Sequence, residues 1–414
     1  MTVPNVLHPF AVPAQDAGAY LDITRAEGCR LWDEEGNTYL DGTASLWYCA
    51  AGHGRREIAE AVAAQMSSVE AFHTFGRFTN PPSERLADVL VELGPIADSR
   101  VLFTSGGSEA IDSAMKIVRA GHRAAGDAGR TVFLSRHYSY HGVMLGGTSL
   151  AGLPANRIPY GPLLGDCYQV ERDSLRAMRD AVAFHGPDRI AAIFAEPVIG
   201  AGGVFPPPEG YLAGLRKLCD ETGALLVFDE VITGFGRLGS WFASLHYGVE
   251  PDLMTFAKAI TSGYLPLGGV IVGPRVRGWL EADDHFLLAH GGTYAGHPTC
   301  CAAGLANLEI LRSEQLPERA REGGRRLRAG LDQLAGRPGV IDVRGEGLMH
   351  AIGLEAPLSA GALAEALLAR GVIGRSLPYA NSVAFSPPLI ISDDEIDELV
   401  SVMGDALADV VAAV

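Results

Sequence analysis

Lysine is scarce in this sequence of 414 residues. Of the 33 lysine and arginine residues only three are lysines, Lys116, Lys217 and Lys258, so arginine supplies nearly all of the positive charge. Arginine stays protonated in proteins, whereas a buried lysine can lose its proton and attack a carbonyl carbon. Lys258 stands in the apolar run "DLMTFAKAITSG", next to a glycine-rich turn, and this setting indicates a chemical role.

An excess of positive charge is absent as well. The formal net charge is -16 and no stripe of basic residues occurs, which argues against a nucleic-acid partner. No run of about 18 uncharged apolar residues is present, so we expect no helix that spans a membrane. The first residues, "MTVPNVLHPFAVPAQDAG", have neither a basic start nor an apolar centre and do not predict a signal peptide.

Closely spaced cysteine pairs are also missing. The six cysteines are spread over the chain and none forms a C-x-x-C pair: Cys29, Cys49, Cys167, Cys219, Cys300 and Cys301. This spacing predicts neither a disulfide scaffold nor a metal site. We expect the thiols to be small buried side chains of a cytoplasmic protein.

The middle of the chain contains short apolar runs that alternate with helical patterns. Runs that predict strands buried on both faces are Arg100–Thr104, Arg130–Ser135, Arg189–Glu196, Ala224–Glu230, Asp252–Ala257 and Gly268–Gly273. A helix is predicted at Glu209–Gly223, between two of these strands. The alternation favours an α/β fold with a mostly parallel sheet, whose ligands bind at the carboxyl ends of the strands.

From Pro298 onward the pattern changes to α+β. A long helical stretch leads into two short strands within Gly339–Glu355, and helices are predicted at Ser359–Arg370 and Asp393–Val414. Near the N-terminus, Cys29–Gly42 predicts a hairpin that packs with this region.

The length of the chain favours one large domain and a second, smaller one. We expect an N-terminal segment at 1–50 that packs with the small domain, a large domain at 51–310 and a C-terminal small domain at 311–414.

Small and polar residues follow the strand predicted at Arg100–Thr104. The segment "SGGSEAIDSAMKIVR" (Ser105–Arg119) places two glycines and two serines at the start of a helix. Backbone amides, hydroxyls and the positive end of the helix dipole form an anion site suited to a phosphate. A simple helix cap, with Ser108 as the N-cap and Glu109 in the first turn, explains the same residues.

Charged residues also end two of the predicted apolar strands. Asp229 and Glu230 end one strand, where an acid costs free energy unless it has a partner. That partner is either a positive group of a bound ligand or a set of backbone donors. Lys258 follows the strand Asp252–Ala257, where the ordinary alternative is a solvated surface cation. A phosphate site, an acid and a lysine at neighbouring strand ends are the groups that pyridoxal phosphate requires.

Eight segments match the motifs of one enzyme family, in the order in which the family has them. They are "LWYCAAGHG" (Leu46–Gly54), "SGGSEAIDSAMK" (Ser105–Lys116), "YHGVMLGGTSLAG" (Tyr140–Gly152), "EPVIGAGGV" (Glu196–Val204), "FDEVITGFGRLG" (Phe228–Gly239), "PDLMTFAKAITSGYLPLG" (Pro251–Gly268), "HGGTYAGHP" (His290–Pro298) and "SPPLII" (Ser386–Ile391). With these motifs the chain resembles the class III (omega) aminotransferases, which depend on pyridoxal 5'-phosphate. The resemblance implies the aspartate-aminotransferase fold (fold type I), with a seven-stranded, mostly parallel sheet in the large domain. It also implies a homodimer with shared active sites.

The resemblance implies a role for each residue at the cofactor. Lys258 matches the lysine that forms the Schiff base, and Asp229 matches the acid that pairs with the pyridinium nitrogen. The other positions match residues that cover the ring or hold the phosphate: Gly107, Ser108, Tyr140, His141, Gly142, Val231 and, from the neighbouring subunit, Thr293.

Two further residues resemble the family's substrate-binding positions. Trp47 matches an aromatic wall of the substrate pocket. Arg375 matches the arginine that receives a substrate carboxylate in the amine–pyruvate group. It lies in "GVIGRSLPYANSVAFSPPL", which we expect to be a loop about two residues longer than usual, and this context allows the arginine to move.

One departure from a family pattern favours a subgroup. The ornithine and 4-aminobutyrate enzymes resemble E-P-x-Q-x-E, in which the second glutamate holds the carboxylate-binding arginine. Here Ile199 and Ala201 stand in place of the glutamine and that glutamate. The chain is therefore most similar to the amine or β-alanine–pyruvate group.

The expected function is transfer of an amino group from an amine or an ω-amino acid to a keto acid such as pyruvate, by a ping-pong mechanism. Another reaction on the same scaffold, by an aminomutase or a decarboxylating aminotransferase, is the first alternative. The second is a protein that binds the cofactor without catalysis.

Reduction of the holoenzyme with borohydride should fix the cofactor on Lys258, and peptide mapping identifies the labelled lysine. A label on Lys116 or Lys217 would contradict the assignment. Lys258→Arg should lose the covalent cofactor and turnover although it keeps the positive charge, because a guanidinium does not attack an aldehyde.

Overall fold

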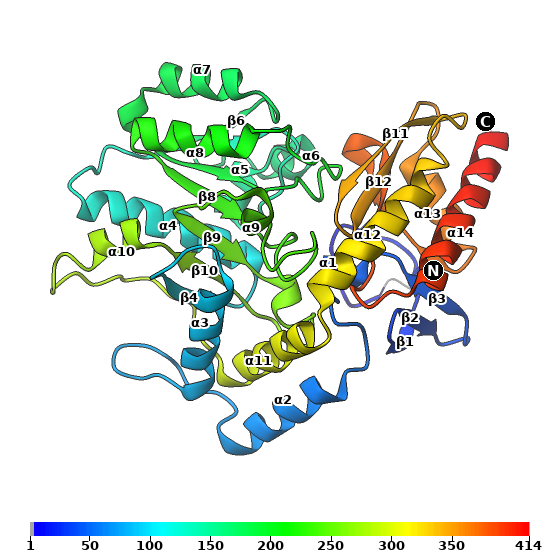
Figure 1. Cartoon of the computed structure of the whole chain (residues 1–414), viewed down its shortest axis with the longest axis horizontal. Coiled ribbons are helices and arrows are strands. Elements are labelled where there is room, and N and C mark those ends of the chain that lie inside the picture. The colour runs from blue at the N-terminus through cyan, green and yellow to red at the C-terminus, as the bar shows by residue number, and fades with distance from the viewer. Residues whose placement is uncertain (1–3, 414) are drawn as a thin grey trace.

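A mixed sheet of seven strands forms the centre of the larger body in this computed structural model, which describes residues 4–413 (Figure 1). In spatial order the strands are β4 (Arg100–Thr104), β10 (Gly268–Val272), β9 (Leu253–Phe256), β8 (Leu225–Asp229), β7 (Ile190–Ala195), β5 (Val132–Arg136) and β6 (Cys167–Val170). β10 is antiparallel to both of its neighbours, and the other neighbouring pairs are parallel. All strands except β10 therefore end at one edge, and the prediction of a mostly parallel sheet is confirmed.

The two faces of the sheet are covered by different helices. Side chains alternate along a strand, so Phe133 of β5 packs with one buried cluster and its neighbours Val132 and Leu134 pack with another. The first cluster includes side chains of α4 (Gly107–Ala124) and α10 (Pro274–Leu280), and the second those of α7 (Leu175–His185) and α8 (Tyr211–Thr222). Burial of each large apolar side chain stabilises the sheet by about 1.5–3 kcal/mol.

Local signals set where several helices begin and end. α8, predicted at Glu209–Gly223, ends before Gly223, whose φ of 76° is the left-handed conformation that favours glycine. α14 (Asp393–Ala412) begins with a capping box between Ser392 and Glu395. Val414, the last residue of the predicted C-terminal helix, lies outside the described residues.

The smaller body combines the two ends of the chain (Figure 1). Its four-stranded sheet has the order β11 (Val340–Glu346), β12 (Met349–Leu354), β15 (Ser382–Phe385) and β14 (Arg375–Leu377). α12 (Leu316–Asp332) and α13 (Ala360–Leu368) pack with this sheet, and α14 packs against both of these helices. A second small sheet contains β1 (Ile23–Glu27), β2 (Arg30–Asp33), β3 (Thr38–Asp41) and β13 (Val372–Ile373). Because β13 pairs with β3, the N-terminal hairpin is tied to the C-terminal part of the chain.

The expected loop around Arg375 is wrong. Arg375 opens β14 and pairs with Ala384 of β15, so its backbone belongs to a hairpin. The turn between the two strands is short because Pro378 starts it and Asn381 ends it in the left-handed conformation, with a φ of 42°. The polar and proline-containing residues therefore form only the turn, and the residues on either side of it form strands.

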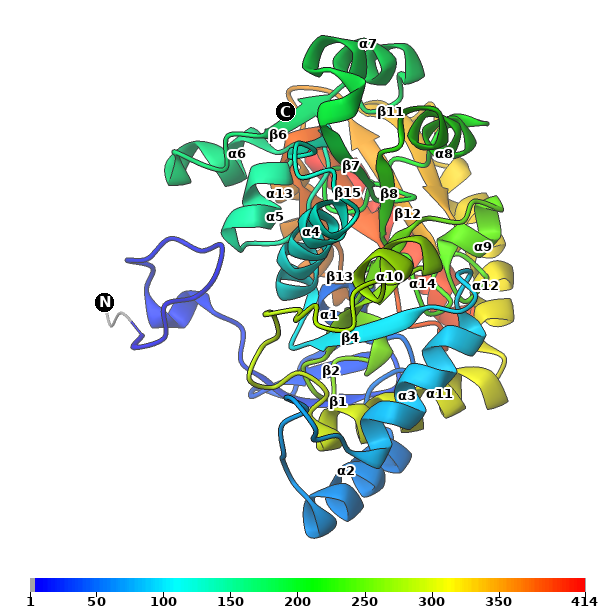
Figure 2. The same cartoon turned by 90° about the vertical axis from the view of Figure 1, so that its left-hand side faces the viewer.

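α11 (Pro298–Ser313) leads from the larger body to the smaller one, and two other helices pack against it. These two are α2 (Arg56–Ser68) and α3 (Pro81–Leu93), and α11 leads directly toward α12. Figure 2 shows the segment before β1 standing away from the rest of the chain. Its apolar side chains are exposed, with Leu7 77% and Phe10 79% accessible.

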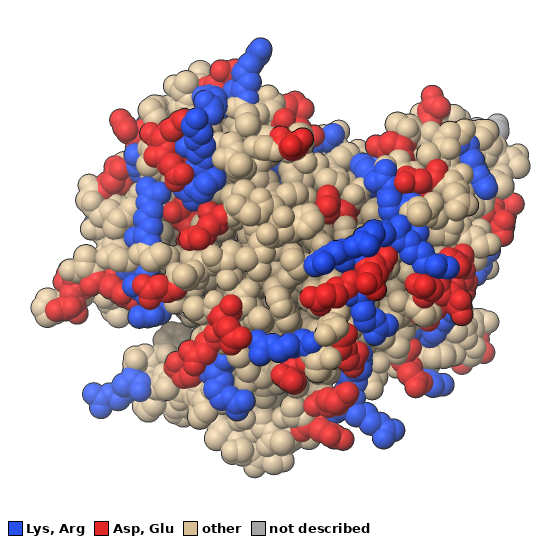
Figure 3. All heavy atoms as spheres, viewed as in Figure 1, with Lys and Arg blue, Asp and Glu red and all other residues tan. Residues whose placement is uncertain are grey.

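Basic and acidic side chains are interspersed on the face shown in Figure 3. Both terminal nitrogens of Arg55 donate to Glu314, at 2.7 and 2.8 Å, and Arg326 contacts Asp397 in the same two-point manner. The planar guanidinium suits such paired contacts, which agrees with the preference for arginine over lysine. Within residues 4–413, no helix has the length and apolar content needed to cross a bilayer.

Candidate active site

The carboxyl ends of five strands surround one cavity of about 170 Å³. Residues that follow β4, β5, β7, β8 and β9 line it: Gly107, Ser108, Ile111, Tyr140, His141, Gly142, Glu196, Asp229, Val231, Ile232 and Lys258. Eight of the eleven predicted site residues are in this set, which the structure brings together from far apart in the sequence.

Lys258 enters the cavity from a constrained turn. It follows β9 and has a φ of 51°, a left-handed conformation that is unusual for a residue with a side chain. Asn307 of α11 holds this turn, because its Nδ2 donates to the carbonyls of Ala259 at 2.8 Å and Ile260 at 3.0 Å. The turn therefore aims the Lys258 side chain while α11 supports the strain.

The environment of Lys258 favours its neutral amine. Burial lowers the pKa of Lys258 to about 8, the nearby charges of Asp229 and Glu196 raise it, and Arg375 lowers it further. The cost of desolvating the ammonium thus exceeds the attraction of two carboxylates. A lysine poised in this way is both a nucleophile and a general base.

Asp229 is a buried carboxylate with three donors. His141 Nδ1 lies 2.8 Å from Asp229 Oδ2, and Asp229 Oδ1 accepts from the Val231 amide and the Thr255 hydroxyl. His141 Nε2 is buried and has no hydrogen-bond partner among the described residues. These contacts fix the carboxylate so that it can face a positive group in the cavity.

Glu230, the neighbouring acid, has a structural environment. It points away from the cavity and accepts hydrogen bonds from the amides of Ala243 and Ser244 and from the Thr233 hydroxyl. Burial raises the pKa of Glu230, and these donors offset part of that effect. Of the two acids at the end of β8, only Asp229 is available to a ligand.

Glu196 is a cavity residue that the sequence interpretation did not include among the site residues. It follows β7, and its two oxygens accept from the amides of Tyr140 and Gly200, each at 2.9 Å. Burial raises its pKa, His141 lowers it and Asp229 raises it. An acid directly after an apolar strand was a usable signal, since the same signal identified Asp229. Glu196 fixes the backbone that carries Tyr140.

The glycines of the cavity form a cradle that a side chain would fill. A Cβ at Gly107 would lie 3.0 Å from Val231, and a Cβ at Gly142 would lie 2.6 Å from the Ser108 hydroxyl. Gly142 also has a φ of 95°. These positions leave the first amides of α4 accessible to an anion.

The N-cap alternative for Ser108 is wrong. Gly106 is the N-cap of α4, and Ser108 lies inside the helix, where its hydroxyl accepts from the Val143 amide at 3.1 Å. A cradle without side chains, an available carboxylate and a lysine with a lowered pKa fit the phosphate, ring nitrogen and aldehyde of pyridoxal phosphate.

Three predicted residues lie outside the lining set. Arg375 is close enough that its charge lowers the pKa of Lys258, and burial lowers the pKa of Arg375 itself. Trp47 is buried in the same cluster as Ile232, which lines the cavity. Thr293 is exposed, at the tip of a turn closed by a hydrogen bond from the Ala295 amide to the Gly292 carbonyl.

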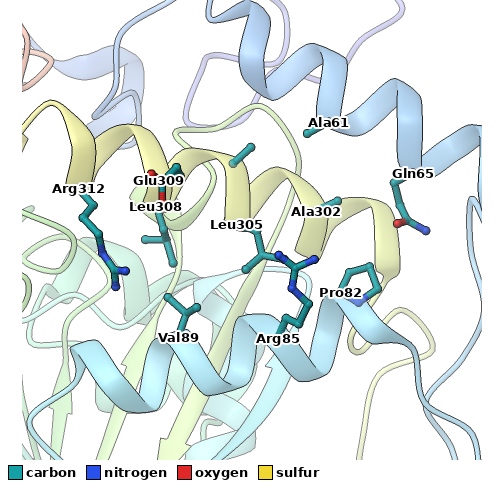
Figure 4. A pocket seen from close by; sticks show the side chains of 11 residues that line it. Ala61, Gln65, Pro82, Arg85, Val89, Ala302, Leu305, Leu308, Glu309 and Arg312 are labelled. Carbon is teal, nitrogen blue, oxygen red and sulfur yellow. The ribbon is translucent and has the colours of Figure 1, made fainter.

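A larger hollow of about 440 Å³ lies between α2, α3 and α11 (Figure 4). Its walls carry Arg85 and Arg312, and Arg312 contacts Glu92. It contains none of the residues described above, and its lining combines apolar side chains such as Leu305 with charged ones such as Glu309. The smaller cavity holds the reactive groups.

The fold as a whole resembles solved transaminases. An amine transaminase from an uncultivated Pseudomonas species, in its PLP-bound form, superposes with a TM-score of 0.94 at 37% identity and covers 98% of this chain and 99% of its own. Together with the cavity, this similarity defines a fold type I transaminase that uses pyridoxal 5'-phosphate.

The chain belongs to the class-III aminotransferases, whose family model matches residues 11–407. The omega-amino acid–pyruvate aminotransferase of Pseudomonas putida is 36% identical over 93% of this chain and 91% of its own length. A mitochondrial gamma-aminobutyrate transaminase of Oryza sativa subsp. indica is 35% identical over 97% and 84%. The protein is therefore an aminotransferase, and such enzymes work by a ping-pong mechanism.

Recombination of the apo-enzyme with pyridoxal phosphate should become faster as the pH rises through about 8, because only the neutral amine of Lys258 attacks the aldehyde. Stopped-flow absorbance measures the rate. Burial and the charge on Arg375 both lower the pKa of Lys258, so Arg375→Leu should move the inflection to higher pH and Arg375→Lys should move it less. An inflection near the ordinary lysine value of about 10.4 in the wild type would contradict this assignment.

Proposed function

We propose that this aminotransferase moves an amino group from an amine or an ω-amino acid to a keto acid, with pyruvate as the preferred acceptor. The proposal rests on the observation that Arg375 is buried and has no carboxylate partner among the described residues. Its guanidinium lies beside the cavity, its Nε is buried without a hydrogen bond, and no ion pair to a carboxylate is formed within the described chain. Ala201 occupies the place of the glutamate that holds such an arginine in the ornithine and 4-aminobutyrate enzymes.

An arginine without a fixed partner suits two kinds of substrate. A keto acid brings a carboxylate that the guanidinium can bind at two points, whereas an amine without a carboxylate brings none. Because Arg375 sits on β14, its backbone stays in place and only its side chain rotates between the two half-reactions. The pyruvate-dependent relative from Pseudomonas putida supports the same acceptor.

We infer the cofactor contacts from the donors that surround the cavity. The amides of Gly107 and Ser108 would bind the phosphate, and Tyr140 and Val231 would lie against the ring. Asp229 would accept a hydrogen bond from the ring nitrogen and favour its protonated form. When bound, pyridoxal 5'-phosphate supplies an aldehyde that takes up the substrate's amino group and a ring that withdraws electrons from the substrate carbon.

Lys258 performs the proton transfer. Its Nζ is the group that would hold the cofactor's aldehyde carbon. With its pKa lowered to about 8, the amine is neutral far more often than an ordinary lysine at the same pH, and the neutral form would accept the proton of the substrate carbon. The protonated Nζ would then act as a general acid and donate this proton in the next step of the transfer.

We infer that the enzyme is a homodimer in which each site takes Thr293 from the partner subunit. The support is a set of exposed large apolar side chains: Phe72, Phe75, Phe78, Val143, Leu145 and Tyr294 are each 48–66% exposed. Exposed apolar surfaces of this kind mark protein interfaces. The exposed N-terminal segment offers a further contact to the second copy.

We also propose the division into 1–50, 51–310 and 311–414, because the seven-stranded sheet and the two smaller sheets separate near these limits. A cytoplasmic location agrees with the six cysteines, which are all free and buried.

Asp229→Asn should lose about two to three orders of magnitude in turnover, as expected when one preorganised electrostatic group is removed. The amide does not keep the ring nitrogen protonated, but it keeps the size of the side chain, so cofactor binding should persist. Glu230→Gln is the matched control for the fold, since Glu230 faces away from the cavity. Turnover near that of the wild type in Asp229→Asn would mean that Asp229 is only structural.

The substrate proposal is tested by assaying a panel of amines and ω-amino acids with pyruvate and with 2-oxoglutarate. Arg375→Ala should slow the pyruvate half-reaction roughly ten- to a hundredfold, the value of a charge-assisted contact of about 1.5–3 kcal/mol. The half-reaction of an amine without a carboxylate should change little. Equal losses in both half-reactions would show that Arg375 serves the fold rather than the carboxylate.

A further inference from the structure

Lys116, another of the three lysines, has a partner that the reaction does not explain. Its Nζ lies 2.9 Å from His290 Nδ1, and His290 Nε2 lies 2.8 Å from the hydroxyl of Ser113. An ammonium only donates, so Nδ1 accepts and Nε2 carries the hydrogen that is donated to Ser113. Ser113 and Lys116, which both lie on α4, thus form hydrogen bonds with the two ring nitrogens of His290.

This contact requires lysine rather than arginine. An imidazole nitrogen offers a single lone pair, which suits the compact ammonium, whereas the guanidinium fork suits carboxylates. Burial and the Lys116 charge lower the pKa of His290, which keeps the ring neutral and able to accept. Lys116 is therefore a second position, after Lys258, at which the structure explains why lysine is present instead of arginine.

His290 begins the segment that carries Thr293, and two other contacts hold the same segment. Glu109 lies against Gly292, since a Cβ there would meet Glu109 Oε1 at 2.1 Å, and its other oxygen accepts from the Ser105 amide at 2.8 Å. On the far side, the Thr74 hydroxyl donates to the Ala295 carbonyl at 3.0 Å. The exposed turn at Thr293 is therefore held at both ends.

We propose that Lys116, Ser113 and His290 are positioning residues that fix the Thr293 turn for the phosphate site of the partner subunit. The inference rests on the proposed shared site. It gives α4 two tasks: its first amides serve the cofactor of its own subunit, and Ser113 and Lys116, about two turns further along, serve the neighbouring cofactor through Thr293.

Hybrid dimers separate these two tasks. One chain carries Lys258→Ala, so the only functional site belongs to the other chain and receives Thr293 from the Lys258→Ala chain. Lys116→Met is placed either on the Lys258→Ala chain, in trans to the functional site, or on the chain with Lys258, in cis. Borohydride fixation of pyridoxal phosphate on Lys258, quantified by mass spectrometry, reports occupancy of the functional site alone.

We expect Lys116→Met in trans to raise the half-saturating cofactor concentration about tenfold, within the roughly ten- to hundredfold loss for a charge-assisted contact to phosphate. The cis arrangement should stay at the wild-type value. Lys217→Met is the matched control, because Lys217 is an exposed lysine of α8 near Glu221, and it should have no effect in either arrangement. In trans, Thr293→Ala should cause the largest increase in the half-saturating cofactor concentration. Adding Lys116→Met to the same chain should cause no further increase.

An effect of Lys116→Met in cis alone would show that it disturbs α4 itself, and the proposal would be wrong. The proposal would also be wrong if Thr293→Ala lowers occupancy in trans while Lys116→Met in trans leaves it unchanged. If Thr293→Ala has no effect in trans, the shared site itself is wrong and the positioning role falls with it.

Discussion

The rest of the structure depends on the burial of Lys258 near two carboxylates in one cavity. Burial disfavours the ammonium, while Asp229 and Glu196 favour it, and the balance leaves the pKa near 8. This balance holds only if both acids stay where they are. Each acid is therefore fixed by hydrogen bonds from neighbouring segments: His141 and Thr255 for Asp229, and two backbone amides for Glu196.

The sheet explains how such groups come together. Parallel strands bring their carboxyl ends to one edge, so residues that are far apart in sequence become neighbours there. The antiparallel β10 preserves this arrangement, because it inverts the direction twice and leaves β4 parallel to β9. The amides of α4 and the amine of Lys258 thus face one cavity although a strand of opposite direction lies between them.

Much of the fold and part of the site could be predicted from the sequence. Apolar runs and the residues directly after them placed Asp229 and Lys258, because both signals are local. Glu196 follows the same rule, yet its importance comes from the amides of Tyr140 and Gly200, which only the folded chain brings near. Arg375 was placed in a loop because pairing between β14 and β15 is a tertiary contact that composition does not reveal. The position of Trp47 depends on positive φ values at Ala44, Ser45 and Trp47, which no residue preference predicts.

The two ends of the cavity meet opposite physical requirements. At the Asp229 end, the charge that develops during reaction is always in the same place, so rigid donors are best and the carboxylate has three of them. Under the role proposed for Arg375, the substrate at that end alternates between molecules with and without a carboxylate, so a fixed ion pair would be unfavourable in one half of every cycle. The absence of a carboxylate partner for Arg375 within the described chain, and alanine at position 201, leave that charge free to respond. Rigidity at one end and freedom at the other therefore follow from the same requirement, that one pocket serve two substrates in turn.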